Sequence, residues 1–205
     1  MLHLPLLKFV MSFFGPLTRF LFGVRSDGAE NIPKEGRVIL TPNHVHALDP
    51  VWIGSTQPRL FMSMAKAEIF RNRFFAFFIR KLGGFPINRG KSDLRGLATA
   101  KRVLTDDNML LIYPEGTRSK TGEMGTMHKG ALVLAEKANA PIVPAFITEK
   151  PKLKLFGKIY VRYGKPVTLE ELLSGWDESL GQDKLEYACN ALKVRMQELE
   201  NKEYR

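Results

Sequence analysis

Short apolar runs that alternate with helical patterns divide most of this chain into predicted strands and helices. The runs that favour strands lie at residues 38–40, 60–64, 85–87, 109–113, 142–147 and 158–163. The run at 109–113, with the sequence MLLIY, is apolar throughout, as is typical of a central strand covered on both faces. Helical patterns lie at about 68–82, 92–104, 130–139 and 180–199. The alternation predicts an α/β fold in which helices flank a mixed, mostly parallel sheet.

Individual residues indicate where two of these helices begin and which side they bury. Ser92 is a candidate N-cap for the helix that runs to about Leu104. The last helix is amphipathic, with charges of both signs on its outer face. Its apolar side carries Leu185, Ala188, Leu192, Met196 and Leu199.

The N-terminal segment, residues 2–23, is the most apolar part of the chain. Its polar positions, Lys8, Ser12, Gly15 and Arg19, are spaced by four, three and four, so a helix would carry them as one narrow stripe. A wide apolar face with a thin basic stripe is typical of a helix that lies in the headgroup region of a membrane. Gly15-Pro16 is expected to divide the segment into two short helices. A core helix and a membrane-spanning helix are the alternatives.

We therefore predict two parts, membrane-associating helices at residues 1–23 and one α/β domain at residues 24–205. A chain of 205 residues fits one such domain. Its net charge of +10 suits an anionic membrane surface, a phosphorylated ligand or nucleic acid. No recognisable zinc finger or helix-turn-helix motif supports nucleic acid. Cys189 is the single cysteine and has no partner for an intrachain disulfide, which favours a reducing compartment.

Candidate chemistry is concentrated where His44 and Asp49 follow the apolar run at 38–40. A carboxylate can fix the tautomer of a histidine and stabilise its protonated form, which makes the imidazole a general base near neutral pH. Along a regular helix five residues rotate by about 500°, so the two side chains would not share a face. We expect the segment to turn before a helix starts, which brings Asp49 within hydrogen-bonding reach of His44.

Two further polar blocks follow predicted strands. One ends in Arg89 and the other, at 113–119, contains Arg118, and both arginines are fork-shaped donors suited to a phosphate. In the second block Gly116 would let the backbone approach a ligand closely, and Glu115 could orient the arginines or bind a ligand hydroxyl. The chain has no G-x-S-x-G elbow and no Walker loop, which argues against an acyl-serine hydrolase and against ATP use.

In this order, the blocks resemble those of the glycerolipid acyltransferases, above all the 1-acyl-glycerol-3-phosphate (lysophosphatidic acid) acyltransferases. Asn43-His44 with Asp49 matches the family's N-H-x4-D block, and the sequence PEGTR at 114–118 matches its P-E-G-T-R block without a change. The sequence FPINR at 85–89 matches a block that ends in an arginine, and PIVP at 141–144 matches the final apolar block. The resemblance covers about residues 24–166.

This resemblance implies transfer of a fatty acyl group from a thioester to the free hydroxyl of 1-acyl-glycerol 3-phosphate, which gives phosphatidic acid. His44 would act as the general base and Asp49 would orient it. The residues expected to bind the acceptor phosphate or shape its site are Arg89, Arg118, Glu115, Gly116, Thr117 and, with less weight, Lys66.

A thioester is already activated, so we expect no metal and no cofactor beyond the co-substrate, acyl-CoA or an acyl carrier protein thioester. The expected partners are an anionic membrane surface and a lysophospholipid acceptor, without nucleic acid. The expected location is the cytoplasmic face of the cell membrane, with peripheral or monotopic attachment.

Two positions depart from the family pattern, and three alternative functions stay open. His46 stands where the family more often has serine, and Asn88 stands where an acid is frequent, so acceptor choice could differ.

The first alternative is a member of the same family with another acceptor, such as glycerol 3-phosphate or a different lysophospholipid. The others are a metal hydrolase built around His44, His46 and Asp49, and a non-enzymatic membrane-binding protein.

Overall fold

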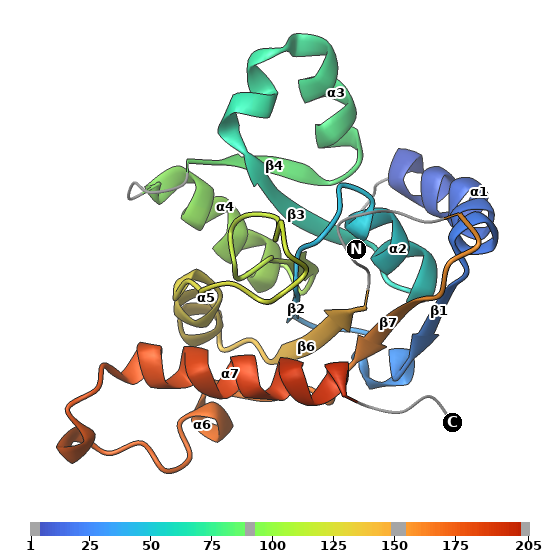
Figure 1. Cartoon of the computed structure of the whole chain (residues 1–205). Coiled ribbons are helices and arrows are strands. Elements are labelled where there is room, and N and C mark those ends of the chain that lie inside the picture. The colour runs from blue at the N-terminus through green and yellow to red at the C-terminus, as the bar shows by residue number, and fades with distance from the viewer. Residues whose placement is uncertain (1–4, 89–92, 149–154, 202–205) are drawn as a thin grey trace.

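A twisted sheet covered by helices on both faces forms the body of the protein (Figure 1). The structure is a computed structural model, and it describes residues 5–88, 93–148 and 155–201. Within these residues the sheet has the strand order β1-β7-β6-β2-β5-β3-β4. The strands are β1 (Val24–Asp27), β2 (Val38–Pro42), β3 (Phe61–Lys66), β4 (Gly84–Ile87), β5 (Met109–Leu111), β6 (Ile142–Ile147) and β7 (Ile159–Tyr163).

Parallel pairing dominates the sheet. Strands β6, β2, β5, β3 and β4 all run in one direction, whereas β7 pairs antiparallel to β6 and β1 runs parallel to β7. The predicted mixed, mostly parallel α/β sheet is confirmed. The helices are α1 (Pro5–Phe22), α2 (Asp49–Thr56), α3 (Arg73–Lys81), α4 (Leu94–Thr105), α5 (Gly130–Ala138), α6 (Leu169–Leu172) and α7 (Lys184–Glu200).

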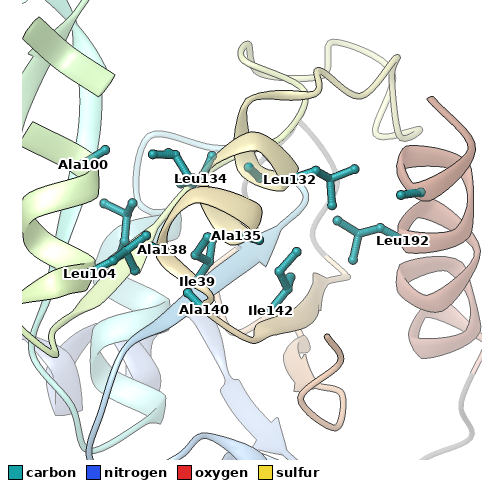
Figure 2. Close-up of a cluster of buried hydrophobic side chains, with 14 of the residues drawn as sticks. Ile39, Ala100, Leu104, Leu132, Leu134, Ala135, Ala138, Ala140, Ile142 and Leu192 are labelled. Atoms are coloured by element: carbon teal, nitrogen blue, oxygen red, sulfur yellow. The ribbon is translucent and has the colours of Figure 1, made fainter. Parts of the chain in front are cut away.

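Alternate residues of the central strands enter two separate hydrophobic clusters, one on each face of the sheet. In β2, Val38 and Leu40 pack into the cluster that contains Trp52 of α2, and Ile39 between them packs into the other. Figure 2 shows this second cluster, in which side chains of α4, α5 and α7 cover Ile39 and Ile142. Burial on both faces explains why the central strands are continuous apolar runs.

Helix ends differ from the sequence-based prediction at three places, each with a local cause. The pattern at 68–82 is a 3₁₀ turn, Ala67–Arg71, followed by α3, because the Asn72 side chain accepts hydrogen bonds from the amides of Phe74 and Phe75. Helix α4 is capped by Asp93, whereas the predicted cap Ser92 lies outside the described residues. Helix α7 begins at Lys184 rather than Leu180 because Asp183 caps it.

The predicted division of the N-terminal segment into two helices is wrong, because α1 is one helix that continues through Pro16. A proline removes one helical hydrogen bond, but packing against α2 supports both halves. The two helices approach closely at Gly54 of α2, where an added Cβ would lie 2.2 Å from the sulfur of Met11, and at Gly15 of α1, where it would lie 2.9 Å from the Cβ of Ser55. Among the described helices, α1 is long and apolar enough to cross a membrane, although most of it is exposed. Its membrane association stays a prediction.

Candidate active site

The order of the strands brings the polar blocks to one edge of the sheet. Strand β5 lies between β2 and β3, and all three are parallel, so their carboxyl ends meet at the same edge. His44 follows β2, the block at 113–118 follows β5, and Lys66 ends β3. Parallel α/β sheets place their ligands at this edge, because loops from neighbouring strands meet there.

His44 and Asp49 form the predicted pair. The Nδ1 atom of His44 lies 2.7 Å from Oδ2 of Asp49, and the chain turns between them before α2 begins at Asp49. The Asp49 side chain is fully buried and also accepts hydrogen bonds from the amides of Val45, at 2.8 Å, and His46, at 3.0 Å. The geometric prediction of a turn that brings the two side chains together is confirmed.

This pairing assigns the tautomer of the imidazole. The carboxylate of Asp49 accepts hydrogen bonds from two backbone amides and has no proton to donate. The Nδ1 atom of His44 must therefore be the donor in the contact between the two side chains, so Nδ1 carries the proton. The other ring nitrogen, Nε2, therefore keeps its lone pair and can take a proton. The position of Asp49 at the N-terminus of α2 favours its negative charge. The pair has the arrangement of a general base with its orienting carboxylate.

Tyr113 supports the ring of His44 from one side, a contact that the sequence did not predict. The two rings stack with their centroids 3.9 Å apart and their planes 20° from parallel. Burial raises the pKa of the Tyr113 hydroxyl well above its usual value, and the nearby Asp49 carboxylate adds to the shift. The phenol therefore stays neutral, and its ring restricts the imidazole to one plane. An aromatic residue two positions after the end of β5 is the signal that could have indicated this contact.

Glu115 has different contacts from those expected. Its two carboxylate oxygens accept hydrogen bonds from the backbone amides of His44, at 2.9 Å, and Gly125, at 2.8 Å. The residue is 4% exposed, so the carboxylate is held inside the protein by these amides. Glu115 thus fixes the backbone of His44 to the loop at 125, which gives it a positioning role in the structure.

Two more contacts hold the turn that contains His44. The side-chain amide of buried Asn43 donates to the carbonyl of Ile147 at 3.0 Å and accepts from its amide at 2.7 Å, which joins the ends of β2 and β6. The amide of Ser119 donates to the carbonyl of His44 at 2.8 Å. The backbone on both sides of the imidazole is therefore fixed before any substrate binds.

Two cavities meet beside His44. One, of about 640 Å³, is mainly apolar, and its lining includes His44, Lys66 and Arg118. The other, of about 570 Å³, is lined by Glu115, Gly116 and His128 among others. Met64, Tyr113 and Thr117 line both cavities, so the two adjoin at these residues.

The expected phosphate-binding residues are only partly brought together. Arg118 and Lys66 are both exposed and line the same cavity as His44, and Lys66 also pairs with Glu68 at 3.3 Å. Gly116 has φ +66, which favours glycine, and a Cβ there would lie 3.1 Å from the His128 ring. Arg89 lies outside the described residues.

The predicted metal-ligand alternative receives no support from the contacts of His46. Its Nδ1 accepts a hydrogen bond from the amide of Leu48 at 3.2 Å, and its ring stacks on Trp52 at 5.5 Å. Within the described ranges, no group of three or more His, Cys, Asp or Glu side chains is arranged to hold a metal ion. His46 therefore acts in the packing of the turn against α2.

Replacement of Asp93 by alanine is expected to lower Tm. The Asp93 carboxylate accepts from the amide of Gly96 at 2.9 Å and from both amides of Asn88, at 2.7 and 2.8 Å. It thereby holds the two ends of the segment that contains Arg89. Thermal unfolding of Asp93→Ala, beside the cap-conserving Asp93→Asn, measures this effect.

The effect of Asp93 also depends on pH. The hydrogen bonds from Gly96 and then Asn88 lower the pKa of the Asp93 carboxyl. A lowered pKa contributes stability above the unfolded value of about 3.9, and this stability is lost as pH falls through the folded value. The difference in Tm between the wild type and Asp93→Ala should therefore narrow from neutral pH to about pH 3. A difference that stays constant would contradict the assigned contacts.

Known proteins with similar sequences and folds agree on one family. A family model described as Acyltransferase matches residues 23–148. The chain is 29% identical to the 1-acyl-sn-glycerol-3-phosphate acyltransferase of Bacillus subtilis, over 88% of this chain and 89% of that protein. It is 28% identical to the protein of the same name from Streptococcus pneumoniae, over 83% of this chain and 64% of that protein.

A solved structure shares the fold. It is the 1-acyl-sn-glycerophosphate (LPA) acyltransferase PlsC from Thermotoga maritima, which matches with a TM-score of 0.72 and 26% identity. The match covers 97% of this chain and 81% of that one. The similarity therefore includes the strand ends at which His44 and the block at 113–118 lie.

Proposed function

The chain belongs to the Acyltransferase family, and we propose that it transfers a fatty acyl group from a thioester to 1-acyl-glycerol 3-phosphate, with phosphatidic acid as the product. The observation that carries this proposal is the pair of His44 and Asp49 in the wall of a largely apolar cavity. A base beside an apolar cavity is what the acylation of a lipid hydroxyl requires.

The reaction requires two proton transfers, one from the acceptor hydroxyl to His44 and one from His44 to the leaving thiolate. Nε2 of His44 takes the proton of the acceptor hydroxyl, and the oxygen attacks the thioester carbonyl carbon. The carbon–sulfur bond then breaks, and the imidazolium returns its proton to the leaving thiolate. Asp49 stabilises the imidazolium between the two transfers, across the 2.7 Å contact to Nδ1. The acyl group is already activated in a thioester, so the proposal includes no metal and no cofactor beyond the acyl-CoA or acyl carrier protein co-substrate.

The acceptor phosphate is assigned to the basic residues around the cavity. Arg118 and Lys66 line it together with His44, and Arg89 belongs to the same proposal on the strength of the sequence. A guanidinium binds a phosphate through paired hydrogen bonds, which orients the glycerol as well as attracting it. Thr117 lines both cavities, where it can contact the headgroup, and Gly116 lets the backbone turn there.

An acyl chain fits the apolar part of the same cavity. Leu7, Val10 and Met11 of α1 contribute to its lining, so the N-terminal helix forms part of the site. The exposed face of α1 carries Phe13, 62% exposed, and Phe20, 72% exposed. We place this face in the headgroup region of the cytoplasmic leaflet, with peripheral or monotopic attachment, because a lipid acceptor resides in the membrane.

The proposal is tested by the release of free thiol from a long-chain acyl-CoA by the purified protein in vesicles. The acceptors are 1-acyl-glycerol 3-phosphate, glycerol 3-phosphate and lysophosphatidylcholine. Release with the first acceptor alone is expected. Release with another acceptor would support the proposed mechanism and identify a different acceptor. The absence of release with both acyl-CoA and acyl carrier protein thioesters as donors would overturn the proposed reaction.

A further inference from the structure

All four phenylalanine side chains of helix α3 are exposed. Phe74 is 67% exposed, Phe75 and Phe77 are each 56% exposed, and Phe78 is 40% exposed. Only Ala76 and Ile79 of the helix are half-buried. A contiguous exposed apolar surface of this kind indicates a site that binds a membrane or another protein.

The exposed face belongs to a formed helix. Asn72 caps its N-terminus through the amides of Phe74 and Phe75, at 3.0 and 3.2 Å, and Arg80 and Lys81 occupy its last turn, where the helix dipole favours cations. The rings of Phe74 and Phe78 pack edge to face at 4.8 Å. The apolar face is therefore fixed in place and available to a partner as a surface.

Basic side chains border this aromatic face at both ends of the helix. They are Arg71, Arg73, Arg80 and Lys81, and the sequence has no acidic residue between Glu68 and Asp93. Arg80 lies over the Phe70 ring at 5.1 Å, and Lys81 lies over the Phe77 ring at 5.7 Å. Long cationic side chains that rest on aromatic rings can keep their charged ends among lipid phosphates while the rings enter the acyl region.

Helices α3 and α1 lie on either side of the cavity that reaches His44. Leu7 and Met11 of α1 and Ile79 of α3 line it, together with His44 itself. In Figure 1, α3 stands at the top of the view and α1 at the upper right, whereas α7 crosses the bottom. The exposed apolar surfaces of α1 and α3 thus flank one cavity at the end of the molecule away from α7.

We propose that α3 is a second membrane-insertion element. Its phenylalanines enter the acyl region of an anionic leaflet, and its three basic side chains, together with Arg71 of the preceding turn, contact lipid phosphates. Together with α1 it holds the apolar cavity against the leaflet, so that a lipid reaches His44 without passing through water. This inference rests on the proposed function only in that the acceptor is a membrane lipid. The binding surface itself follows from the exposed rings and the charge.

Vesicle binding by Phe74→Ser/Phe77→Ser tests the proposal. The matched control is Leu180→Ser/Val194→Ser, because both control residues are 52% exposed and lie far along the chain from α1 and α3. With phosphatidylglycerol vesicles, the α3 variant is expected to bind about tenfold more weakly or worse, whereas the control binds as the wild type does. The variant retains partial binding because α1 is intact.

A charge variant separates the two contributions. Arg73→Gln/Arg80→Gln/Lys81→Gln is expected to lose about fivefold in affinity per residue for anionic vesicles, and nothing for neutral ones. Equal affinities of the wild type and both α3 variants would overturn the proposal. A change from dimer to monomer in the phenylalanine variant, with unchanged vesicle binding, would overturn it too and would assign the face to a second copy of the chain.

Activity on two substrate forms distinguishes this inference from the proposed function. With short-chain acceptor and donor in free solution, the α3 variants should turn over like the wild type. With acceptor in vesicles, their rate should fall in proportion to binding. A wild type inactive on both forms would contradict the function and not the surface. Phe75→Trp supplies a direct reading against the background of Trp52 and Trp176. Brominated lipid should quench a larger share of its fluorescence than of the wild type's, and the share in Val194→Trp should not exceed that of the wild type. Equal quenching of the two would overturn insertion.

Discussion

His44→Ala is expected to lower the rate of acyl transfer by about 10³-fold, the middle of the range for loss of a general base. The imidazole is the group with a free ring nitrogen at the wall of the cavity, and Asp49 fixes its orientation. Without it, water must take the proton of the acceptor hydroxyl. KM for the acceptor should change little, because the side chains proposed to bind its phosphate remain.

Single-turnover and steady-state rates of the variant measure this loss, and His46→Ala is the matched control. His46 lies two residues away, but its Nδ1 accepts from the Leu48 amide and its ring stacks on Trp52. The control should therefore retain most of the activity and lose some stability. If His46→Ala lost as much activity as His44→Ala with both variants folded, the assignment of the base would be wrong.

Asp49→Ala is expected to damage both stability and catalysis. The buried carboxylate accepts hydrogen bonds from the amides of Val45 and His46 as well as from His44. Their loss leaves buried donors unsatisfied, which should cost about 2–4 kcal/mol of the free energy of unfolding. The imidazole also loses the group that orients it, so kcat should fall by about 10²-fold or more.

Asp49→Asn separates these two effects. An asparagine oxygen can still accept from the backbone amides, so most of the stability should return. It carries no charge to stabilise the imidazolium, so kcat should stay low while KM stays near that of the wild type. Chemical denaturation and steady-state kinetics of both variants provide the comparison. Full recovery of kcat in Asp49→Asn would show that Asp49 acts only through the fold of the turn.

The general outline of the fold was predictable because its central strands are covered on both faces. A continuous apolar run such as 109–113 indicates that environment directly. Strand β1, by contrast, has the sequence VRSD and no apolar pattern, and it forms by pairing with β7 along the edge of the sheet. A helix was expected after the turn at His44, but its bounds were not predicted, because α2 has only eight residues and too short an apolar pattern to mark its ends.

The contact between His44 and Asp49 was predictable from spacing, whereas the contacts that support it were not. His44 and Asp49 are close in sequence, so a turn is enough to join them. Glu115 accepts hydrogen bonds from the backbone amides of His44 and Gly125. Nearly every residue has such an amide, so the residue types do not indicate which amides it contacts. The stack of Tyr113 on His44 likewise depends on the pairing of β2 with β5.

Helices α1 and α3, which we propose face the membrane, show the same limit. Pro16 predicted a break in the N-terminal segment, but contact with α2 at Gly15 keeps α1 continuous. The aromatic run in α3 fits the helical pattern predicted at about 68–82, and only the structure shows that Phe74 and Phe77 are exposed. Tertiary packing decides both cases, and local propensity does not describe it.

The most direct test of the account is the conversion of 1-acyl-glycerol 3-phosphate and acyl-CoA to phosphatidic acid, identified by mass spectrometry, for the wild type and His44→Ala side by side. The account predicts one phosphatidic acid per free thiol in the wild type and almost none in the folded variant. Phosphatidic acid formed at the same rate by both proteins, or thiol released without an ester product in the wild type, would contradict it.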